Sequence, residues 1–414
     1  MKVREQAIAA RTASRKLAGL TRSQKDRALS NIAAALRSQV DRIGAENQRD
    51  LALAREAGLS EAMLDRLTMG PKTVEATAKG VEEIIALEDP VGRRGQMVQR
   101  DNGMLVGRQS IPLGVLGMVY ESRPNVTVDA ASLCLKSGNA VLLRGGKEAA
   151  YSNLVLGEII QSALEASGLP SSSVQIVSAE SRATIGELIG LSGLVDLVIP
   201  RGGEGLIRYV TENARVPVIQ HFKGVCHLYL DQGCDLQMAS DLAYNGKVQR
   251  PGVCNALECL LVDEADAERI LPKAVEALLH AGVQLRGCPR TVALVPEASP
   301  AADDEWGTEY LAKILAVRVV DGIEGALEHV AAWGSNHTEA ICTNHYDHAQ
   351  RWLREVDASC VLVNASTRFN DGGQLGLGAE IGISTSKLHA YGPMGLASLT
   401  TEKWVVLGQG QVRG

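Results

Sequence analysis

The sequence predicts an α/β protein in which two parallel sheets are each covered by helices. The first observation is an alternation of short apolar strands with amphipathic helices over residues 112–222. The second is a renewed alternation over residues 226–365. Apolar strands separated by amphipathic helices are typical of parallel sheets that are buried on both faces. A length of 414 residues leaves room for two or three domains of ordinary size.

Residues 1–90 are expected to be helical, and residues 97–111 to form a β-hairpin. Within residues 23–58 the apolar side chains fall on one stripe and the charged ones on the other, as in amphipathic helices. In the hairpin segment, Asn102 and Gly103 separate two short extended runs. An Asn-Gly pair favours a two-residue hairpin turn, because both residues adopt positive φ angles readily.

The two alternating series follow this hairpin. Strands of the first series are expected at 112–120, 139–144, 174–178, 194–200 and 216–222. Its helices are expected at 128–138, 151–168, 182–193 and 203–215. The second series has strands at 226–231, 258–263, 291–295, 315–320, 339–343 and 360–365, and a helix at 266–282. The glycine-rich segment 369–395 lacks a clear period, and a last strand is expected at 398–407.

Composition and charge argue against several classes of protein. The formal net charge is −6, which gives no electrostatic footprint for nucleic acid. No uninterrupted apolar stretch approaches the ~18 residues of a membrane span, and the first twenty or so residues lack the apolar region of a signal peptide. The eight cysteines include no C-x-x-C pair, as is typical of reduced thiols in the cytoplasm. We therefore expect a cytoplasmic protein that binds neither nucleic acid nor membrane.

Two glycine-containing turns follow strands of the first series. Arg144, Gly145 and Lys147 stand at the end of one strand, and Arg201 and Gly202 at the end of another. Ligands of open parallel sheets bind at the carboxyl ends of the strands. Glycine lets a phosphate approach the backbone, and the N-terminus of a following helix attracts anions. Neither turn has the G-x-G-x-x-G spacing, but two such turns in one sheet favour a cofactor that carries phosphate.

Two cysteines, Cys254 and Cys259, lie five positions apart in "VQRPGVCNALECLLVD". Cys259 belongs to an apolar run that predicts a buried strand, where a thiol packs like a small hydrophobic side chain. Cys254 follows Gly252 in a glycine-proline turn with Arg250 upstream. Cations and exposed backbone N–H groups favour the thiolate, which is the nucleophile. Spacing alone leaves open whether Cys254 is catalytic or a structural residue.

Two further groups of residues are candidates for chemistry. The loop in 120–130 places Arg123 and Asn125 beside Pro124, so it is either a polar loop shaped by proline or a substrate loop in which Asn125 or Arg123 donates hydrogen bonds. A loose set of cysteines and histidines has gaps that match no familiar zinc spacing, so we expect no metal. This set consists of His221, Cys226, His227 and Cys234.

Four stretches together resemble the gamma-glutamyl phosphate reductases, also called glutamate-5-semialdehyde dehydrogenases, a family within the aldehyde dehydrogenase superfamily. They are residues 112–149, 200–207 ("PRGGEGLI"), 249–258 ("QRPGVCNALE") and 369–390 ("FNDGGQLGLGAEIGISTSKLHA"). The likeness runs over essentially the whole chain and in the same order. It implies an aldehyde dehydrogenase-like α/β fold with three functional parts.

The three parts implied by the resemblance are built from discontinuous segments. Residues 1–98 and 112–225 would form the nucleotide-binding domain for NADPH. Residues 226–365 would form the catalytic domain that carries the cysteine. Residues 99–111 and 386–414 would form a small β-flap that mediates oligomerisation.

The resemblance also implies roles for individual residues. Cys254 matches the nucleophile of the family, and Asn125 is the expected donor to the oxyanion. Contacts to NADPH are expected from Ser122, Arg144, Gly145, Gly202 and Glu309. Contacts to the substrate are expected from Arg123, Arg250 and His221.

The implied reaction is NADPH-dependent reduction of L-glutamyl 5-phosphate to L-glutamate 5-semialdehyde and phosphate, the second step of proline biosynthesis from glutamate. The Cys254 thiolate would displace phosphate and form a thioester. Hydrolytic aldehyde dehydrogenases carry a glutamate base in the turn that here reads "QHFKG" (220–224), which has no carboxylate. Without that base we expect phosphate, rather than water, to accept the acyl group in the oxidative direction.

Three departures from the family pattern lie near the flap. Tyr391 stands where arginine is expected, Ala397 where glutamate is expected and Glu402 where tyrosine is expected. They leave the oligomer contacts open, although we expect a homo-oligomer and consider the upstream glutamate kinase a possible partner. Two alternatives remain at this stage. One is a related dehydrogenase with another acyl donor, such as a CoA thioester, and the other is a non-catalytic scaffold that only binds nucleotide.

Overall fold

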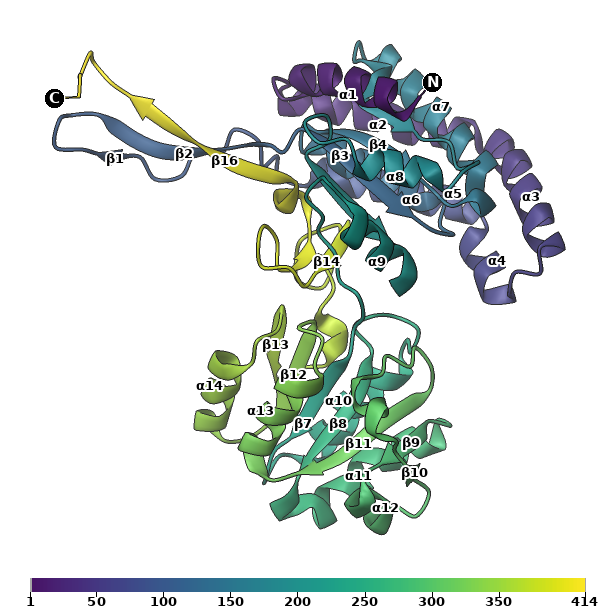
Figure 1. Cartoon of the computed structure of the whole chain (residues 1–414), viewed down its shortest axis with the longest axis vertical. Helices are drawn as coiled ribbons and strands as arrows, with labels where there is room; N and C mark the ends of the chain where they lie inside the picture. Colours follow the sequence, from purple (N-terminus) through teal and green to yellow (C-terminus); the bar gives the residue numbers. More distant parts are fainter. Residues whose placement is uncertain (1, 414) are drawn as a thin grey trace. The chain divides into compact units, whose positions relative to one another are not determined.

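The computed structural model describes residues 2–413 and confirms an α/β fold made of two compact units. The first unit comprises Met1–Gln220, Leu377–Gly382 and Met394–Gly414. The second comprises His221–Gly376 and Ile383–Pro393. Each unit is built around its own parallel sheet (Figure 1). Over residues 2–413, no helix has both the length and the apolar character that crossing a membrane requires.

The sheet of the first unit has four parallel strands in the order β5-β4-β3-β6. The strands are β3 (Val115–Tyr120), β4 (Ala140–Arg144), β5 (Val174–Ile176) and β6 (Leu197–Arg201). Helices α1 (Val3–Leu17) and α8 (Ala183–Ile189) pack together against it, as do α6 (Asn125–Lys136) and α7 (Ala150–Ala166). Every residue of β3 and β4 is buried, which explains why these strands read as continuous apolar runs.

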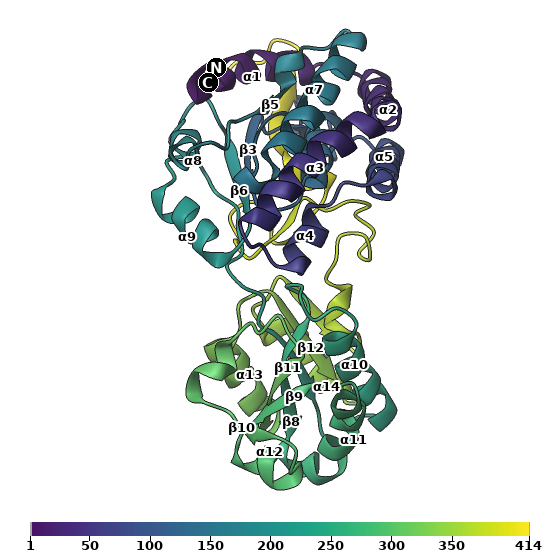
Figure 2. The same cartoon turned by 90° about the vertical axis from the view of Figure 1, so that its right-hand side faces the viewer.

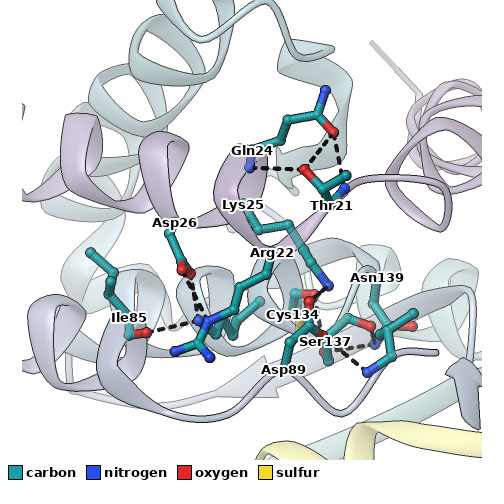
Figure 3. Close-up of polar contacts among 12 residues, drawn as sticks. Thr21, Arg22, Gln24, Lys25, Asp26, Ile85, Asp89, Cys134, Ser137 and Asn139 are labelled. Carbon is teal, nitrogen blue, oxygen red and sulfur yellow. Dashed lines mark hydrogen bonds and ion pairs between the residues drawn. The ribbon is translucent and has the colours of Figure 1, made fainter. Parts of the chain in front are cut away.

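The helical N-terminal region forms a further layer on α6 and α7. Its helices are α2 (Arg22–Ser38), α3 (Val40–Glu56), α4 (Glu61–Leu67) and α5 (Pro71–Ala86). Two lysines where this layer meets α6 are fully buried and paired with carboxylates, as Figure 3 shows in part. Lys25 lies 2.5 Å from Asp89, and Lys136 lies 2.5 Å from Asp26. These ion pairs connect α2 to α6 and to the segment that follows α5.

The hairpin predicted at 97–111 is present and pairs with the C-terminal strand, but residues 100–104 connect its strands in place of the predicted two-residue Asn-Gly turn. β1 (Val98–Gln99), β2 (Leu105–Pro112) and β16 (Thr400–Leu407) form an antiparallel sheet in the order β1-β2-β16. Figure 1 shows these strands extending away from the helices of the first unit. We call this three-stranded sheet the flap. Its role in oligomerisation remains a prediction.

The second unit contains a seven-stranded parallel sheet in the order β10-β9-β11-β8-β7-β12-β13. The strands are β7 (Cys226–Leu230), β8 (Leu257–Asp263), β9 (Gln284–Gly287), β10 (Ser299–Pro300), β11 (Ile314–Val320), β12 (Thr338–Cys342) and β13 (Cys360–Val363). The glycine-rich segment that follows contributes two short paired strands, β14 (Gly382–Ser384) and β15 (Gly392–Met394).

Alternate residues of the central strands point to opposite faces of this sheet. Leu228 and Leu260 pack on one face with α10 (Leu236–Val248), α11 (Ala267–His280) and α12 (Pro289–Leu294). Tyr229 and Cys259 pack on the other face with α13 (Gly322–Trp333) and α14 (Tyr346–Glu355). Figure 2 shows α13 and α11 on opposite sides of the strands. In the first unit, the helix α9 (Glu204–Asn213) follows strand β6.

Two predicted strands are wrong. Residues 291–295 lie in and directly after α12, because Pro289 occupies the first turn and the Thr291 hydroxyl donates to the Val317 carbonyl. Residues 216–222 make only a single bridge, between Val198 and Val218. Pro217 has no N–H with which to extend a ladder, although its carbonyl accepts from the Val198 N–H.

Candidate active site

Three neighbouring strands of the second unit bring the candidate active site together. The segments before β7, β8 and β12 carry His221, Cys254 and His337 respectively. These strands are adjacent in the order β8-β7-β12 and run parallel, so their amino ends meet at one edge of the sheet. The Cys254 sulfur and one ring nitrogen of each histidine lie within 4.8 Å of one another.

Cys254 lies in the turn between α10 and β8 and is partly exposed. The Cys226 thiol donates to its carbonyl oxygen at 3.2 Å. Gly224 packs directly on the same peptide, since a Cβ added to Gly224 would stand 1.9 Å from the Cys254 carbonyl oxygen. The turn that contains Gly224 therefore fixes the backbone of the turn that contains Cys254. The apolar run after the turn buries Cys259 in β8 as predicted, with 1% of that residue exposed.

A polar pocket of about 300 Å³ lies beside this turn. It is lined by Asn245, Gln249, Arg368, Phe369, Asp371 and Gln374. The Asn255 amide donates to the Asn370 carbonyl at 2.9 Å, and the Arg368 Nε donates to Gln249 at 2.9 Å. Burial lowers the pKa of Arg368, Asp371 and Cys254 raise it, and the nearby Arg250 lowers it further. The pocket thus places a cationic side chain close to Cys254.

The two histidines of the site have different environments. His221 is partly exposed, and its Nδ1 lies 3.1 Å from the Ile383 carbonyl. His337 is fully buried, with Nδ1 2.7 Å from the Thr338 hydroxyl. Burial, together with repulsion from His221 when that ring is protonated, lowers the pKa of His337 to about 3, so the His337 imidazole is neutral near pH 7. The His337 Nε2 is buried, and within residues 2–413 it has no hydrogen-bond partner.

Glu309 lies against the "QHFKG" turn. Its carboxylate accepts the Gly224 N–H at 2.9 Å, and the Lys223 ammonium donates to the Gly307 carbonyl at 2.6 Å. The turn itself carries no carboxylate, but a carboxylate from a distant segment therefore stands beside it. Residues 221–225, which we grouped with the nucleotide-binding domain, fall in the second unit because of these contacts and the packing on Cys254.

The predicted cofactor residues of the first unit lie at the carboxyl ends of β3, β4 and β6. The Arg144 guanidinium is buried and donates to the carbonyls of Gly145 and Ser181, at 2.9 and 3.2 Å, and to the Thr184 hydroxyl at 3.4 Å. Burial lowers its pKa, which the nearby Arg182 lowers further. Three of the five N–H donors of this guanidinium are therefore used within the chain. Lys147 and Arg182 are exposed in the same region.

The turn after β6 already holds a carboxylate. The Gly203 N–H donates to Glu121 at 2.9 Å, at the N-terminus of α9. A Cβ at Gly202 would stand 2.4 Å from the same carboxylate oxygen. Glycine at position 202 is therefore required for an anion to lie this close to the backbone. The arrangement matches the anion-binding geometry expected of this turn.

The loop after β3 is held by carboxylates. Ser122 adopts a φ of 45°, and both its N–H and its hydroxyl donate to Glu148, at 2.7 and 2.9 Å. Asn125 begins α6 and donates to Asp129 at 3.0 Å. Burial raises the pKa of Asp129 to about 6, although Asn125 and Arg201 act against the shift. Arg123 lies between these residues, before Pro124.

The structure brings together some of the predicted site residues and adds others. His221 and Cys254 meet in the second unit, and Glu309 contacts the Gly224 peptide that packs on Cys254. The loose set of cysteines and histidines separates, because His227 faces Cys259 and His329 on the other side of β7. His337 and Arg368 come from distant segments, and no local pattern marks them in the sequence.

The chain was also compared with known proteins. A family model described as the aldehyde dehydrogenase family matches residues 1–305. A gamma-glutamyl phosphate reductase of Sorangium cellulosum is 62% identical over 409 residues, which cover 98% of this chain and 96% of the relative. One of Desulfatibacillum aliphaticivorans is 56% identical over 409 residues, with 99% and 98% covered.

A solved structure agrees with these relatives. The crystal structure of a gamma-glutamyl phosphate reductase from Thermotoga maritima has a TM-score of 0.98 and 44% sequence identity, and the match covers 100% of both chains. Such agreement over full length fixes the family as well as the fold. The chain belongs to the gamma-glutamyl phosphate reductases, a group of oxidoreductases within the aldehyde dehydrogenase family.

Proposed function

We propose that the chain reduces L-glutamyl 5-phosphate to L-glutamate 5-semialdehyde and phosphate with NADPH, as the second step of proline biosynthesis from glutamate. The observation that carries the proposal is the partly exposed Cys254, whose turn is fixed by Gly224 and faces two histidines. The names of the full-length relatives favour an acyl phosphate over a CoA thioester as the acyl donor.

In the proposed mechanism the Cys254 sulfur attacks the acyl carbon, the C–O bond to phosphate breaks, and a thioester forms. Backbone N–H groups of the turn stabilise the oxyanion, with Asn125 as our proposed side-chain donor. Arg368 and Arg250 supply positive charge for the departing phosphate. The hydride that turns the thioester into the aldehyde is what NADPH supplies when it is bound.

We also propose that His221 and Arg123 contact the substrate. The hydrogen bond of His221 Nδ1 with the Ile383 carbonyl implies that Nδ1 carries the proton, which leaves Nε2 as an acceptor. A neutral acceptor beside Cys254 can take the thiol proton when the nucleophile forms. Arg123 lies in the loop after β3. Pro124 and the hydrogen bond from Ser122 to Glu148 restrain the backbone of this loop on both sides of Arg123.

The residues proposed for the cofactor fit a phosphate-bearing ligand. The Gly203 N–H already donates to the Glu121 carboxylate, which stands in for an anionic oxygen at the N-terminus of α9. A bound pyrophosphate would take the place of that carboxylate. Ser122, Gly145 and Glu309 are the remaining proposed contacts.

NADPH selectivity is proposed to come from the cations around β4. Arg144 has donors left for a 2′-phosphate, and the exposed Lys147 and Arg182 add charge without losing internal hydrogen bonds. Because Arg144 also holds the loop that carries Ser181, its loss would affect folding as well as binding. Replacement of Lys147 or Arg182 therefore tests selectivity more cleanly than replacement of Arg144.

We further propose a cytoplasmic homo-oligomer, assembled through the flap, that receives its labile substrate from a glutamate kinase. The exposed apolar side chains of the flap support this assembly, because a sheet edge with apolar residues is a template for pairing. The semialdehyde is the practical substrate for a test, since an acyl phosphate hydrolyses in water.

The test is steady-state reduction of NADP⁺ by L-glutamate 5-semialdehyde, with and without phosphate. We expect sustained turnover only with phosphate, and a lower KM for NADP⁺ than for NAD⁺. Lys147→Ala and Arg182→Ala should raise the KM for NADP⁺ more than that for NAD⁺. Turnover that requires CoA instead of phosphate would contradict the proposal.

A further inference from the structure

We propose that Cys254, His221 and His337 form a reversible Zn²⁺ site that switches the enzyme off by occupying its thiol. The consequence for activity rests on the proposed role of Cys254, but metal binding does not. One ligand atom of each residue already lies within 4.8 Å of the other two. In a tetrahedral zinc site, with bonds of about 2.0–2.3 Å, ligand atoms lie roughly 3.5 Å apart, so modest side-chain rotation closes this site.

The ligand types suit zinc. Thiolate and imidazole are the preferred donors of Zn²⁺, and three protein ligands leave a fourth position for water or an anion. On binding, the Cys254 S–H bond breaks, its proton passes to solvent and an S–Zn bond forms in place of one zinc–water bond. No oxidant or reductant is needed, and a chelator reverses the step.

Both histidines are held in a form that can ligate. His221 Nδ1 lies 3.1 Å from the Ile383 carbonyl, so Nδ1 carries the proton and Nε2 is the ring nitrogen that can ligate. His337 Nδ1 lies 2.7 Å from the Thr338 hydroxyl, and its buried Nε2 has no hydrogen-bond partner among residues 2–413. An orphan nitrogen at a fully buried position is costly and calls for a ligand.

A second cluster provides an internal comparison. His227, Cys259 and His329 also approach within 4.8 Å, but all three are buried. The Arg318 guanidinium lies 3.1 Å from His329 Nδ1, so the proton of that neutral imidazole is on Nε2, which points at Cys259 at 3.6 Å. A protonated nitrogen cannot ligate, and a guanidinium next to the ring repels a cation. The second cluster should therefore not bind zinc.

The experiment uses Co²⁺ as a spectroscopic stand-in for Zn²⁺ on the purified full chain. We expect one Co²⁺ per chain, with a thiolate-to-cobalt charge-transfer band in the near ultraviolet that Zn²⁺ displaces. Cys254→Ser should abolish the band, and Cys259→Ser should leave it unchanged. His221→Ala should weaken Co²⁺ binding at least about tenfold, as loss of metal-site residues generally does. His337→Ala tests the second histidine ligand, and His337→Asn takes its place if the alanine variant fails to fold.

The activity arm is separate from the spectroscopic one. Zn²⁺ should inhibit semialdehyde oxidation, EDTA should restore it fully, and acylation of Cys254 by substrate should protect against the metal. A band that survives Cys254→Ser but is lost in Cys259→Ser would overturn the proposal, and so would the lack of any thiolate band. If Cys254→Ser remains active, the proposed nucleophile is wrong, while the metal site is still decided by the band.

Discussion

Cys254 and Cys259 differ in surroundings more than their separation in the chain suggests. Cys254 is partly exposed in a turn, and Cys259 is buried in β8 beside His329. We expect Cys254→Ser to lower kcat by at least about 10³-fold, because a serine hydroxyl is rarely ionised near neutral pH. Cys259→Ser should keep most of the activity. The measurement is steady-state kinetics on both variants with matched circular dichroism spectra.

Equal losses from the two substitutions, with folding intact, would mean that Cys254 is not the nucleophile. Selective alkylation gives an independent check: Cys288 and Cys360 are also partly exposed, but loss of activity should follow modification of Cys254 rather than of either of these. Mapping the modified peptide after partial inactivation should find Cys254 before any other cysteine.

The raised pKa of Asp129 leads to a prediction about how the unfolding free energy depends on pH. Burial raises its pKa to about 6, so the folded chain holds this proton to a higher pH than the unfolded chain does. Its stabilising contribution is fully present below about pH 4 and is lost as the pH rises towards 6. Asp129→Asn should remove this loss. The unfolding free energy of the variant should therefore rise relative to that of the parent, by at most about 1.4 kcal/mol per pH unit across this window.

Urea denaturation of the parent and of Asp129→Asn at several pH values measures the difference. A difference that stays constant between pH 4 and pH 7 would show that Asp129 titrates normally. A decrease in that range would show that its proton is held less tightly in the folded chain.

The sequence predicted the burial or exposure of a single residue only where the neighbouring residues in the chain determine it. The apolar run predicted that Cys259 is buried, and the glycine-proline turn predicted that Cys254 is accessible. His337 and Arg368 could not be found in this way, because strand order in the sheet brings them to Cys254. The hydrogen bonds of Arg144 to Ser181 and Thr184 could not be predicted either, since these acceptors lie before and within α8, far from Arg144 in the sequence.

At the scale of elements, the contact between two turns is the sharpest structural requirement of the site. A Cβ on Gly224 would stand 1.9 Å from the Cys254 carbonyl oxygen, and no flexible side chain is there to yield. We expect Gly224→Ala to push the two turns apart, break the hydrogen bond to Glu309 and lower kcat at least tenfold. The cost in stability should be about 1–3 kcal/mol, as for overpacking.

Gly44→Ala is the matched control. Gly44 lies inside α3 with nothing within 4 Å of an added Cβ, so alanine should stabilise the chain by about 1 kcal/mol and leave kinetics unchanged. Thermal unfolding and steady-state kinetics of both variants test the pair. If Gly224→Ala behaves like Gly44→Ala, the close packing of the two turns is not needed for activity.

Most elements were predictable because their apolar period is strong. The exceptions have physical causes. The 291–295 run is apolar enough for a strand, but Pro289 and the hydrogen bond of Thr291 favour α12. In 216–222, Pro217 prevents a continuous ladder. The strand order of the seven-stranded sheet was not predictable, since it depends on which neighbours the crossover helices allow.

At the scale of the whole molecule, the flap is the proposed basis of assembly. Val406 of β16 is 52% exposed, and Trp404 and Leu407 of the same strand are also exposed. We expect Val406→Asp to shift the protein to a smaller species in light scattering, because a charge there opposes burial between copies. Leu53→Asp, at an exposed apolar residue of α3 outside the flap, should have no such effect. A parent chain that is monomeric would contradict this proposal.

The central claim is that the acyl group remains bound to Cys254 as a thioester until phosphate removes it. The most direct measurement is stopped-flow absorbance of NADPH formed from the semialdehyde and NADP⁺, without and then with phosphate. We predict a burst of about one NADPH per active site that stops without phosphate and becomes steady turnover when phosphate is added, with the thioester found on Cys254 by mass spectrometry. Sustained phosphate-free turnover, removed by His221→Ala or by Glu309→Gln, would show that one of these side chains activates water and would contradict the claim.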